Sequence, residues 1–173
     1  MDSGLVCAWY GPGGPLISNE DVRALCEASG RFKGVASGDI RDPVRYSDRA
    51  LGMLDLPSAL GCVAEMKHYV RNCGFVAVRV LPWLWERHCD DRLFYPIYAA
   101  CVELQVPLCL QVGHTGPLRP SDMGRPIPHL ERVLLDFPEL TVVGGHIGAP
   151  WQDEMIFLAD KRPRRPTISV SSR

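Results

Sequence analysis

Apolar residues form six short runs along the chain, and amphipathic segments separate these runs. The runs are rich in Val, Leu, Ile and Phe, and they begin near Leu5, Gly34, Phe75, Pro107, Leu140 and Thr167. Short continuous runs of this kind are typical of β-strands that are buried on both faces. Successive runs begin about 30 residues apart, which is the usual length of a strand followed by a crossover helix.

Five segments between the runs have the spacing and end signals of helices. An asparagine cap marks the first segment, Gly74 closes the second, and an acidic cap marks the third. The predicted helices are residues 19–29, 57–72, 91–105, 128–136 and 151–161. Alternating strands and helices predict an α/β fold with a parallel sheet covered by helices. The pattern fits two architectures, a doubly wound sheet and a barrel.

Polar and aromatic side chains follow the ends of three predicted strands. These residues are Arg79 and Trp83 after the third run, His114 after the fourth and His146 after the fifth. Both architectures bind ligands at the carboxyl ends of their strands, so these side chains are candidate substrate-binding or catalytic groups. Packing in the core explains a tryptophan such as Trp83 equally well.

His114 and His146 occupy matching places in two successive strand–helix units. They stand in the segments QVGHTG and VGGHIG, each beside a glycine. A neutral imidazole is a common zinc ligand and the usual general base near neutral pH. A single histidine at a strand end more often has a structural hydrogen-bonding role. Two histidines in matching positions favour a catalytic or metal-binding function.

A loop rich in proline and glycine, residues 116–128, follows His114 and carries Arg119 and Arg125. The loop is longer than a connection between a strand and a helix requires, so it is either a binding loop or a rigid excursion on the surface. A guanidinium group can hold a carboxylate through two hydrogen bonds. Both arginines are therefore candidate substrate-binding residues, with simple exposure to solvent as the alternative.

Composition and charge exclude several other classes of protein. The chain has 173 residues, 46% of them hydrophobic, and a formal net charge of −1. We therefore expect one folded domain over residues 1–173 and no nucleic-acid partner. The apolar runs are too short to span a membrane, and no signal peptide is recognisable, which predicts a cytoplasmic protein. The seven cysteines include no CxxC pair, so we expect reduced and buried thiols.

Three segments carry a resemblance to a known family. They are FVAVRVLPWLWER at residues 75–87, the stretch 94–140, and TVVGGHIGAPWQDEMIFLADK at residues 141–161. These segments resemble the amidohydrolase-related proteins, a family that includes aminocarboxymuconate-semialdehyde decarboxylase. The resemblance implies a (β/α)8 TIM barrel with a divalent metal, usually zinc. It also implies hydrolysis or non-oxidative decarboxylation of a small carboxylated or cyclic substrate.

The same resemblance implies roles for the two histidines. His114 resembles the metal ligand after the fifth strand of the family, and His146 resembles the catalytic histidine after the sixth. The six predicted strands then correspond to strands two to seven, so we expect an incomplete barrel that is truncated at both ends. The sequence has no His-X-His motif, which the first strand of the family supplies. It also has no eighth strand with its aspartate, and residues 162–173 form a divergent basic tail.

Three hypotheses about function follow from these observations. The first is a metal-dependent hydrolase or decarboxylase with a small-molecule substrate. The second is a catalytically inactive barrel fragment that acts at most as a binding or interaction protein. The third is a doubly wound protein that binds a small molecule near the two histidines. A homo-oligomer is a further hypothesis, because a second copy could donate the strands that this chain lacks.

Overall fold

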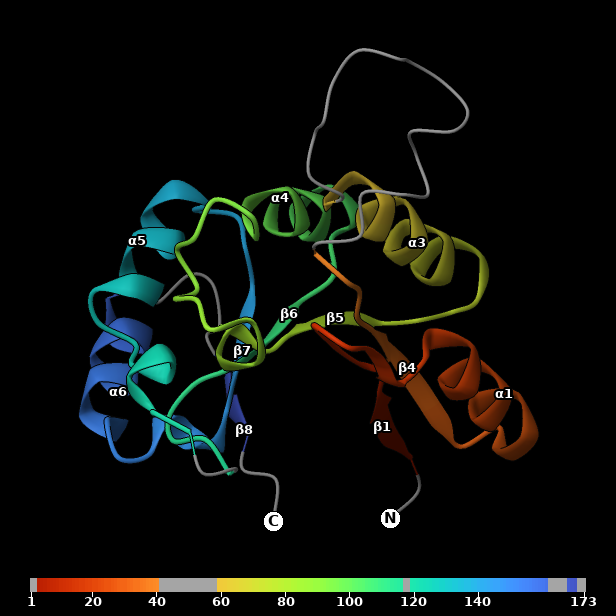
Figure 1. Ribbon diagram of the computed structural model, residues 1–173, viewed down its shortest axis with the longest axis horizontal. Helices are drawn as coiled ribbons and strands as arrows, with labels where there is room; N and C mark the ends of the chain where they lie inside the picture. Colours follow the sequence, from red (N-terminus) through yellow and green to blue (C-terminus); the bar gives the residue numbers. More distant parts are fainter. Residues whose placement is uncertain (1–2, 41–58, 117–118, 162–167, 171–173) are drawn as a thin grey trace.

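The computed structural model describes residues 3–40, 59–116, 119–161 and 168–170 (Figure 1). Six parallel strands form the main sheet in the order β1-β4-β5-β6-β7-β8. Their bounds are Gly4–Cys7 (β1), Phe32–Ala36 (β4), Ala77–Val80 (β5), Leu108–Gln111 (β6), Val142–Gly145 (β7) and Ile168–Val170 (β8). All six predicted strands are therefore present.

The strand order separates the two architectures that the sequence left open. The six strands of the main sheet lie side by side in the order in which they occur in the chain. A doubly wound sheet instead reverses its strand order at a switch point. The sheet is thus an incomplete (β/α)8 barrel, as the resemblance implied, and the doubly wound alternative is wrong. β1 and β8 form the two open edges.

The described ranges contain five α-helices, which lie around the outside of the curled sheet (Figure 1). Their bounds are Asn19–Ser29 (α1), Ala59–Asn72 (α3), Tyr95–Leu104 (α4), His129–Asp136 (α5) and Gln152–Asp160 (α6). Each matches a predicted helix to within a few residues. Residues 57–58 of the second predicted helix and most of the basic tail lie outside the described residues.

Two helix starts differ from their predictions for local reasons. Asn19 is the first residue of α1, and Ser18 is the cap instead, because its side chain and that of Asp21 each accept a backbone N–H of the other residue. The third predicted helix begins at Tyr95 and not at residue 91. The Asp91 side chain accepts the N–H of Leu93 in a turn that precedes the helix.

One hairpin was not predicted. Strands β2 (Trp9–Gly11) and β3 (Gly14–Ile17) pair antiparallel directly after β1. Gly14 has a φ of 98° at the turn between them, a conformation that favours glycine. The hairpin places Trp9 and Tyr10 next to the carboxyl ends of the first strands of the barrel.

The strands alternate between two environments. Val78 and Val80 of β5 are buried in the core between the sheet and the helices, whereas Arg79 between them is only partly buried. Arg79 is in register with Cys109 of β6, which is also partly buried. On β1, Leu5 is 61% exposed. One face of the sheet therefore packs on the helices, and the face toward the barrel interior remains partly open, as expected of an incomplete barrel.

The cysteines agree only in part with the expectation of buried, reduced thiols. None of the seven forms a disulfide, but Cys62, Cys89 and Cys101 alone are buried, and the other four are partly exposed. Cys7 and Cys109 are among those four because the barrel interior is open beside their strands. In the described part of the chain, no helix has the length and apolar character needed to cross a membrane.

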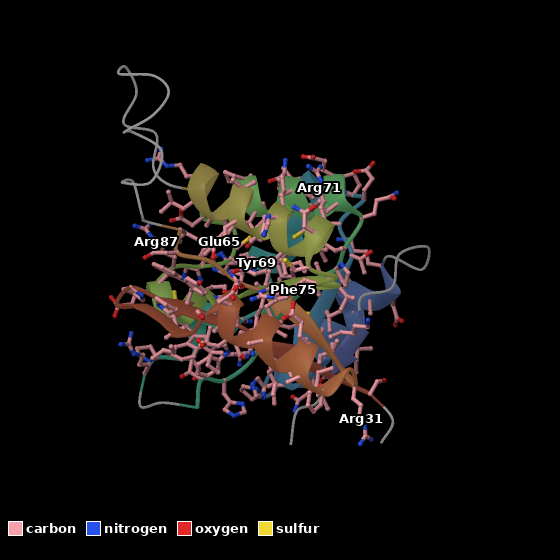
Figure 2. All side chains as sticks on the ribbon, turned by 90° about the vertical axis from the view of Figure 1, so that its right-hand side faces the viewer. Arg31, Glu65, Tyr69, Arg71, Phe75 and Arg87 are labelled. Carbon is pink, nitrogen blue, oxygen red and sulfur yellow. The ribbon has the colours of Figure 1, made fainter. Side chains whose placement is uncertain are left out.

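A buried asparagine joins α1 to β4 and to α3. The Asn19 side chain is completely buried, and its Nδ2 donates to the carbonyl oxygen of Ser37 at 2.8 Å and to Glu65 Oε1 at 2.9 Å. Its Oδ1 accepts the N–H of Ser37 at 3.0 Å. The Tyr10 hydroxyl donates to the same oxygen of Glu65, which lies on α3 (Figure 2). Burial, followed by the charge of Glu65, raises the pKa of Tyr10 to about 12.

We expect Asn19→Ala to lower the free energy of unfolding by about 2–4 kcal/mol, because three buried hydrogen bonds lose their partner. Urea denaturation followed by circular dichroism measures the change. Asn72→Ala is the matched control at an exposed position, with an expected change below about 0.5 kcal/mol. Equal losses in the two variants would show that the Asn19 network contributes no special stability.

Candidate functional site

Four of the predicted site residues lie at the carboxyl edge of the sheet. Arg79 is on β5, and Trp83 is in the short 3-10 helix η1 (Pro82–Trp85) that follows it. His114 follows β6, and His146 begins η3 (His146–Gly148) directly after β7. Strands β6 and β7 are paired, with Gln111 opposite Gly145. The two strands therefore end at the same level. His146 is one residue and His114 three residues beyond that point.

The structure brings the two histidines together. The centroids of their rings are 5.5 Å apart, and the ring planes are inclined by 56°. The His114 N–H donates to the carbonyl oxygen of Ala149 at 2.6 Å, and ring atom Nδ1 lies 3.3 Å from the same oxygen. A proton on Nδ1 completes that second bond and leaves Nε2 with a free lone pair. The Gln111 side chain also donates to the carbonyl oxygen of His114.

Close backbone contacts hold the loops that carry these rings. The Gly113 N–H donates to the carbonyl oxygen of Gly124 in η2 (Asp122–Gly124) at 2.8 Å. A Cβ on Gly124 would overlap the backbone of Gly113, and a Cβ on Gly113 would overlap that of Ala149. At these glycines the loop after β6, the η2 segment and the loop after β7 contact one another through backbone atoms.

His146 has an unusual backbone conformation. Its φ is 59° and that of Ile147 is 56°, values in the left-handed region that costs free energy for residues other than glycine. The strained turn directs the chain away from β7 at the point where the His146 ring meets His114. Strain of this kind is frequent at functional sites.

The surroundings of His146 keep its imidazole neutral at pH 7. Burial lowers the pKa of His146, and the neighbouring His114 and the positive charge of Arg79 lower it further. These effects lower the pKa because the charged imidazolium loses hydration when it is buried and is repelled by a neighbouring cation. A neutral imidazole beside a fixed positive charge can accept a proton at neutral pH.

Arg79 is the cation at the centre of the site. Its guanidinium carbon lies 5.1 Å from the centre of a Trp9 ring, a cation–π contact. It forms no ion pair with any carboxylate in the described ranges of the chain. Its charge also reaches Cys109, although burial dominates there and raises the pKa of that thiol to about 11. Arg79 thus retains its capacity to bind an anion.

Trp83, in η1 directly after β5, has an unused hydrogen-bond donor. The residue is 6% exposed, and its indole N–H has no partner among the described residues. A buried donor without a partner costs free energy. Both sequence interpretations of Trp83 therefore have support, because the ring is buried and its N–H is free to bind a ligand.

The other two predicted residues are engaged elsewhere in this structure. Arg119 pairs with Glu86 at 3.0 Å, and the Arg125 Nη2 and Nε atoms both lie within hydrogen-bond distance of one Glu154 oxygen. The pair Arg125–Glu154 fixes the loop before α5, because the second Glu154 oxygen accepts the N–H of Ile127. The role of Arg119 and Arg125 in substrate binding stays a prediction.

The described residues on their own do not fit a metal ion. No group of three His, Cys, Asp or Glu side chains within the described ranges could hold one, and catalytic zinc sites use three protein ligands. His114 and His146 supply two neighbouring imidazoles. The role of His114 as a metal ligand therefore stays a prediction.

Trp9, Gln111 and Ala149 belong to the site, but the sequence did not single them out. Trp9 holds Arg79 by its ring, Gln111 contacts the backbone of His114, and Ala149 binds His114 through its carbonyl oxygen. Trp9 lies two residues beyond β1, near the carboxyl end of its strand like the other candidates. That position was the signal that could have identified Trp9. The contact of Ala149 is made by its backbone carbonyl, which leaves no signal in a sequence.

Solved structures with the same fold are similar to this chain. An uncharacterised TIM-barrel protein from Bordetella bronchiseptica is 28% identical, with a TM-score of 0.73, and the match covers 98% of this chain and 53% of that protein. A 5-carboxyvanillate decarboxylase from Novosphingobium aromaticivorans, solved with manganese and 4-hydroxy-3-methoxy-5-nitrobenzoic acid, is 19% identical with a TM-score of 0.55. That match covers 90% of this chain and 47% of the enzyme.

A third similar structure is the 4-oxalomesaconate hydratase from Rhodopseudomonas palustris. It is 20% identical with a TM-score of 0.52, and the match covers 88% of this chain and 47% of the enzyme. This chain therefore spans about half the length of these solved relatives. A search of curated protein sequences finds no match.

The sequence profile of the family described as Amidohydrolase matches residues 18–168. The match extends from the cap of α1 to the first residue of β8 and includes Arg79, Trp83, His114 and His146. Because the profile covers far more than half of the chain, this chain belongs to the amidohydrolase family, as its resemblance indicated.

Proposed function

We propose that this chain provides the proton-transfer and anion-binding part of the active site of a metal-dependent barrel enzyme. The substrate is a small carboxylated molecule, and the reaction is hydrolysis or non-oxidative decarboxylation. The observation that carries the proposal is the arrangement of His146 and Arg79, a neutral imidazole beside a cation without an ion pair at the carboxyl edge of the sheet. Family membership supports the reaction class.

Arg79 binds the carboxylate of the substrate in this proposal. A guanidinium that contacts an aromatic ring keeps its N–H groups available in its own plane, and a carboxylate accepts two of them. Trp83 offers its free indole N–H to the same ligand. Two structurally similar enzymes are named for aromatic carboxylates: the 5-carboxyvanillate decarboxylase described above, and a 2,6-dihydroxybenzoate decarboxylase that is 17% identical with a TM-score of 0.57. These names support a substrate of this class.

His146 moves the proton. Its lowered pKa leaves the ring neutral at pH 7, so the ring can take a proton from water or from a substrate hydroxyl. Once protonated, the imidazolium can return that proton to the product. The positive charge of Arg79 makes the imidazolium a stronger acid, which favours this second step.

His114 is the residue that we assign to metal binding. Its Nδ1 contacts the carbonyl oxygen of Ala149, which orients Nε2 for a ligand bond. A divalent ion would supply Lewis acidity to the substrate or to bound water. Manganese occurs in the solved 5-carboxyvanillate decarboxylase, and zinc is the alternative.

A binding protein without catalysis is the second candidate function. The partly open inner face of the sheet, with Leu5 61% exposed on β1, supports it, as does the lack of a three-ligand metal group among the described residues. A cytoplasmic location and a homo-oligomer stay predictions under both candidates.

We expect 2,6-dihydroxybenzoate to bind the chain and to quench its tryptophan fluorescence, because Trp9 lies against Arg79. Arg79→Gln should weaken this affinity by about tenfold or more, the equivalent of a lost charge-assisted hydrogen bond. Arg71→Gln is the matched control, because Arg71 lies on α3 and pairs with Glu103 on α4. Equal affinity in the Arg79→Gln variant and the wild type, or no binding at all, would contradict the proposed anion site.

The pKa of His146 should rise in Arg79→Gln, because the variant removes a neighbouring positive charge. A titration of the imidazole protons by NMR spectroscopy measures it. Because the folded pKa of His146 lies below its unfolded value, the unfolded chain takes up the proton first. Stability contributed by the neutral ring is therefore lost as the pH falls from the unfolded pKa toward the folded one, and His146→Gln should reduce that loss. An unchanged pKa in Arg79→Gln would refute the coupling.

Substitution of the two histidines should separate metal binding from proton transfer. We expect His114→Ala to weaken the affinity of the chain for manganese or zinc by at least about tenfold, as loss of even an indirect metal partner does. His146→Ala should leave metal affinity within about twofold and abolish proton transfer. Equilibrium dialysis followed by elemental analysis measures the metal. Equal metal loss in both variants would overturn this division of roles.

A further inference from the structure

A cysteine, a histidine and an asparagine meet where α3 ends. Cys73 Sγ lies 3.7 Å from His68 Nε2, and Asn72 Nδ2 lies 3.0 Å from His68 Nδ1. The Cys73 N–H donates to the carbonyl oxygen of Tyr69 at 3.1 Å, which fixes the cysteine against the last turn of the helix. His68 and Asn72 are exposed, and Cys73 is half-buried. A thiol and an imidazole are therefore paired within reach of solvent.

The environment of Cys73 differs from that of most other thiols in the chain. Burial raises the pKa of Cys62 and of Cys101 to about 12 and that of Cys109 to about 11. Burial also raises the pKa of Cys89 and of Cys26. These five thiols resist conversion to the reactive thiolate. The Cys73 sulfur instead has an imidazole nitrogen beside it that can take up its proton.

A carboxylate, Glu20, lies near His68 at this end of α3. The pKa of Glu20 is lowered, first by its hydrogen bond with Arg23 and to a smaller extent by the charge of His68. The Tyr69 hydroxyl donates to Glu20, so this carboxylate stays near the end of α3. Arg71, in the last turn of α3 (Figure 2), is paired with Glu103 on α4. The carboxylate of Glu20 is thus held near the pair of His68 and Cys73 by Tyr69.

Asn72 orients the ring. Its amide carries both a donor and an acceptor, and the two can exchange places by rotation of the side chain. With the oxygen toward Nδ1, the amide accepts the Nδ1 proton and leaves Nε2 with its lone pair toward Cys73. The same contact holds when the ring is charged, because Nδ1 then still donates.

We propose that Cys73 is a site of thiol–disulfide exchange with small disulfides and that His68 is the base that activates it. His68 Nε2 takes the thiol proton, and the Cys73 sulfur attacks one sulfur of the disulfide. A new S–S bond forms, the old one breaks, and the second sulfur leaves as a thiolate, which recovers the proton. Cys73 is oxidised to a mixed disulfide while half of the small disulfide is reduced to a thiol.

The modified position is separate from the candidate active site. Cys73 precedes the amino end of β5, and Arg79 lies toward the carboxyl end of the same strand. In a parallel barrel these ends are opposite faces. The proposal therefore stands independently of the proposed enzyme function.

Reaction of the native chain with dithiobis-nitrobenzoate tests this assignment, because each exchange releases a coloured thiolate. We expect one fast-reacting equivalent that peptide mass spectrometry places on Cys73. Cys73→Ser should remove it, and Cys26→Ser, the matched control at another partly exposed thiol, should retain it. His68→Gln should slow the fast phase at pH 7 by about tenfold or more, since general-base assistance is lost.

The denatured chain provides the second comparison. In guanidinium chloride the wild type and His68→Gln should react at the same rate, because the contact between Cys73 and His68 exists only in the folded chain. A fast equivalent on another cysteine would overturn the proposal. An unchanged native rate in His68→Gln would also overturn it.

Discussion

The close approach of three backbone segments around Gly113 is the constraint on which the candidate site depends. The N–H of Gly113 binds the carbonyl oxygen of Gly124, and the next residue, His114, binds that of Ala149. No side chain fits between these segments, since a Cβ on either glycine would overlap a backbone atom. The loops after β6 and β7 are consequently locked to each other. The Cα positions of the two histidines are therefore fixed by main-chain contacts, and the contact of His114 Nδ1 with the Ala149 carbonyl then places the first ring.

The electrostatics of the site follow from which face of the sheet each residue occupies. Alternation along β5 sends Val78 and Val80 toward the helices and Arg79 toward the barrel interior. The cation then lies on the same side as His146, and its ring partner comes from the hairpin after β1. A one-residue shift of β5 would bury Arg79 against the helices and place an aliphatic side chain next to the histidine. The register of this strand thus decides whether the charge of Arg79 adds to burial and to His114 in lowering the pKa of His146.

The sequence predicted the elements of the fold well and the contacts of the site only in part. Strands such as Leu108–Gln111 are short apolar runs at regular intervals, so their positions and their parallel pairing follow from local patterns. Periodicity could not decide between a barrel and a doubly wound sheet, because both bury the same strands. The resemblance to a known family favoured the barrel. The hairpin Trp9–Ile17 was missed because its strands are very short and contain glycine and proline.

For the site, residue type and position at a strand end identified Arg79, His114 and His146. The partners of these residues could not be predicted, because a backbone carbonyl such as that of Ala149 carries no signal in the sequence. The ion pair of Arg125 depends on Glu154, which is distant in the chain. Local patterns predict where a side chain leaves the sheet, and tertiary contacts decide what it meets.

The order of the strands also has a consequence for how the chain folds. Each strand of the main sheet pairs with the strand before it, so no pairing must wait for a distant part of the chain. Every new strand and helix adds to an edge that already exists, and the loop closed at each step is of similar length. The sheet can therefore grow in the direction of synthesis as the chain leaves the ribosome. At every stage of that growth the edge formed by the newest strand stays unpaired until the next strand docks on it. The rate of synthesis relative to the rate of strand docking therefore determines how long an edge prone to aggregation is exposed.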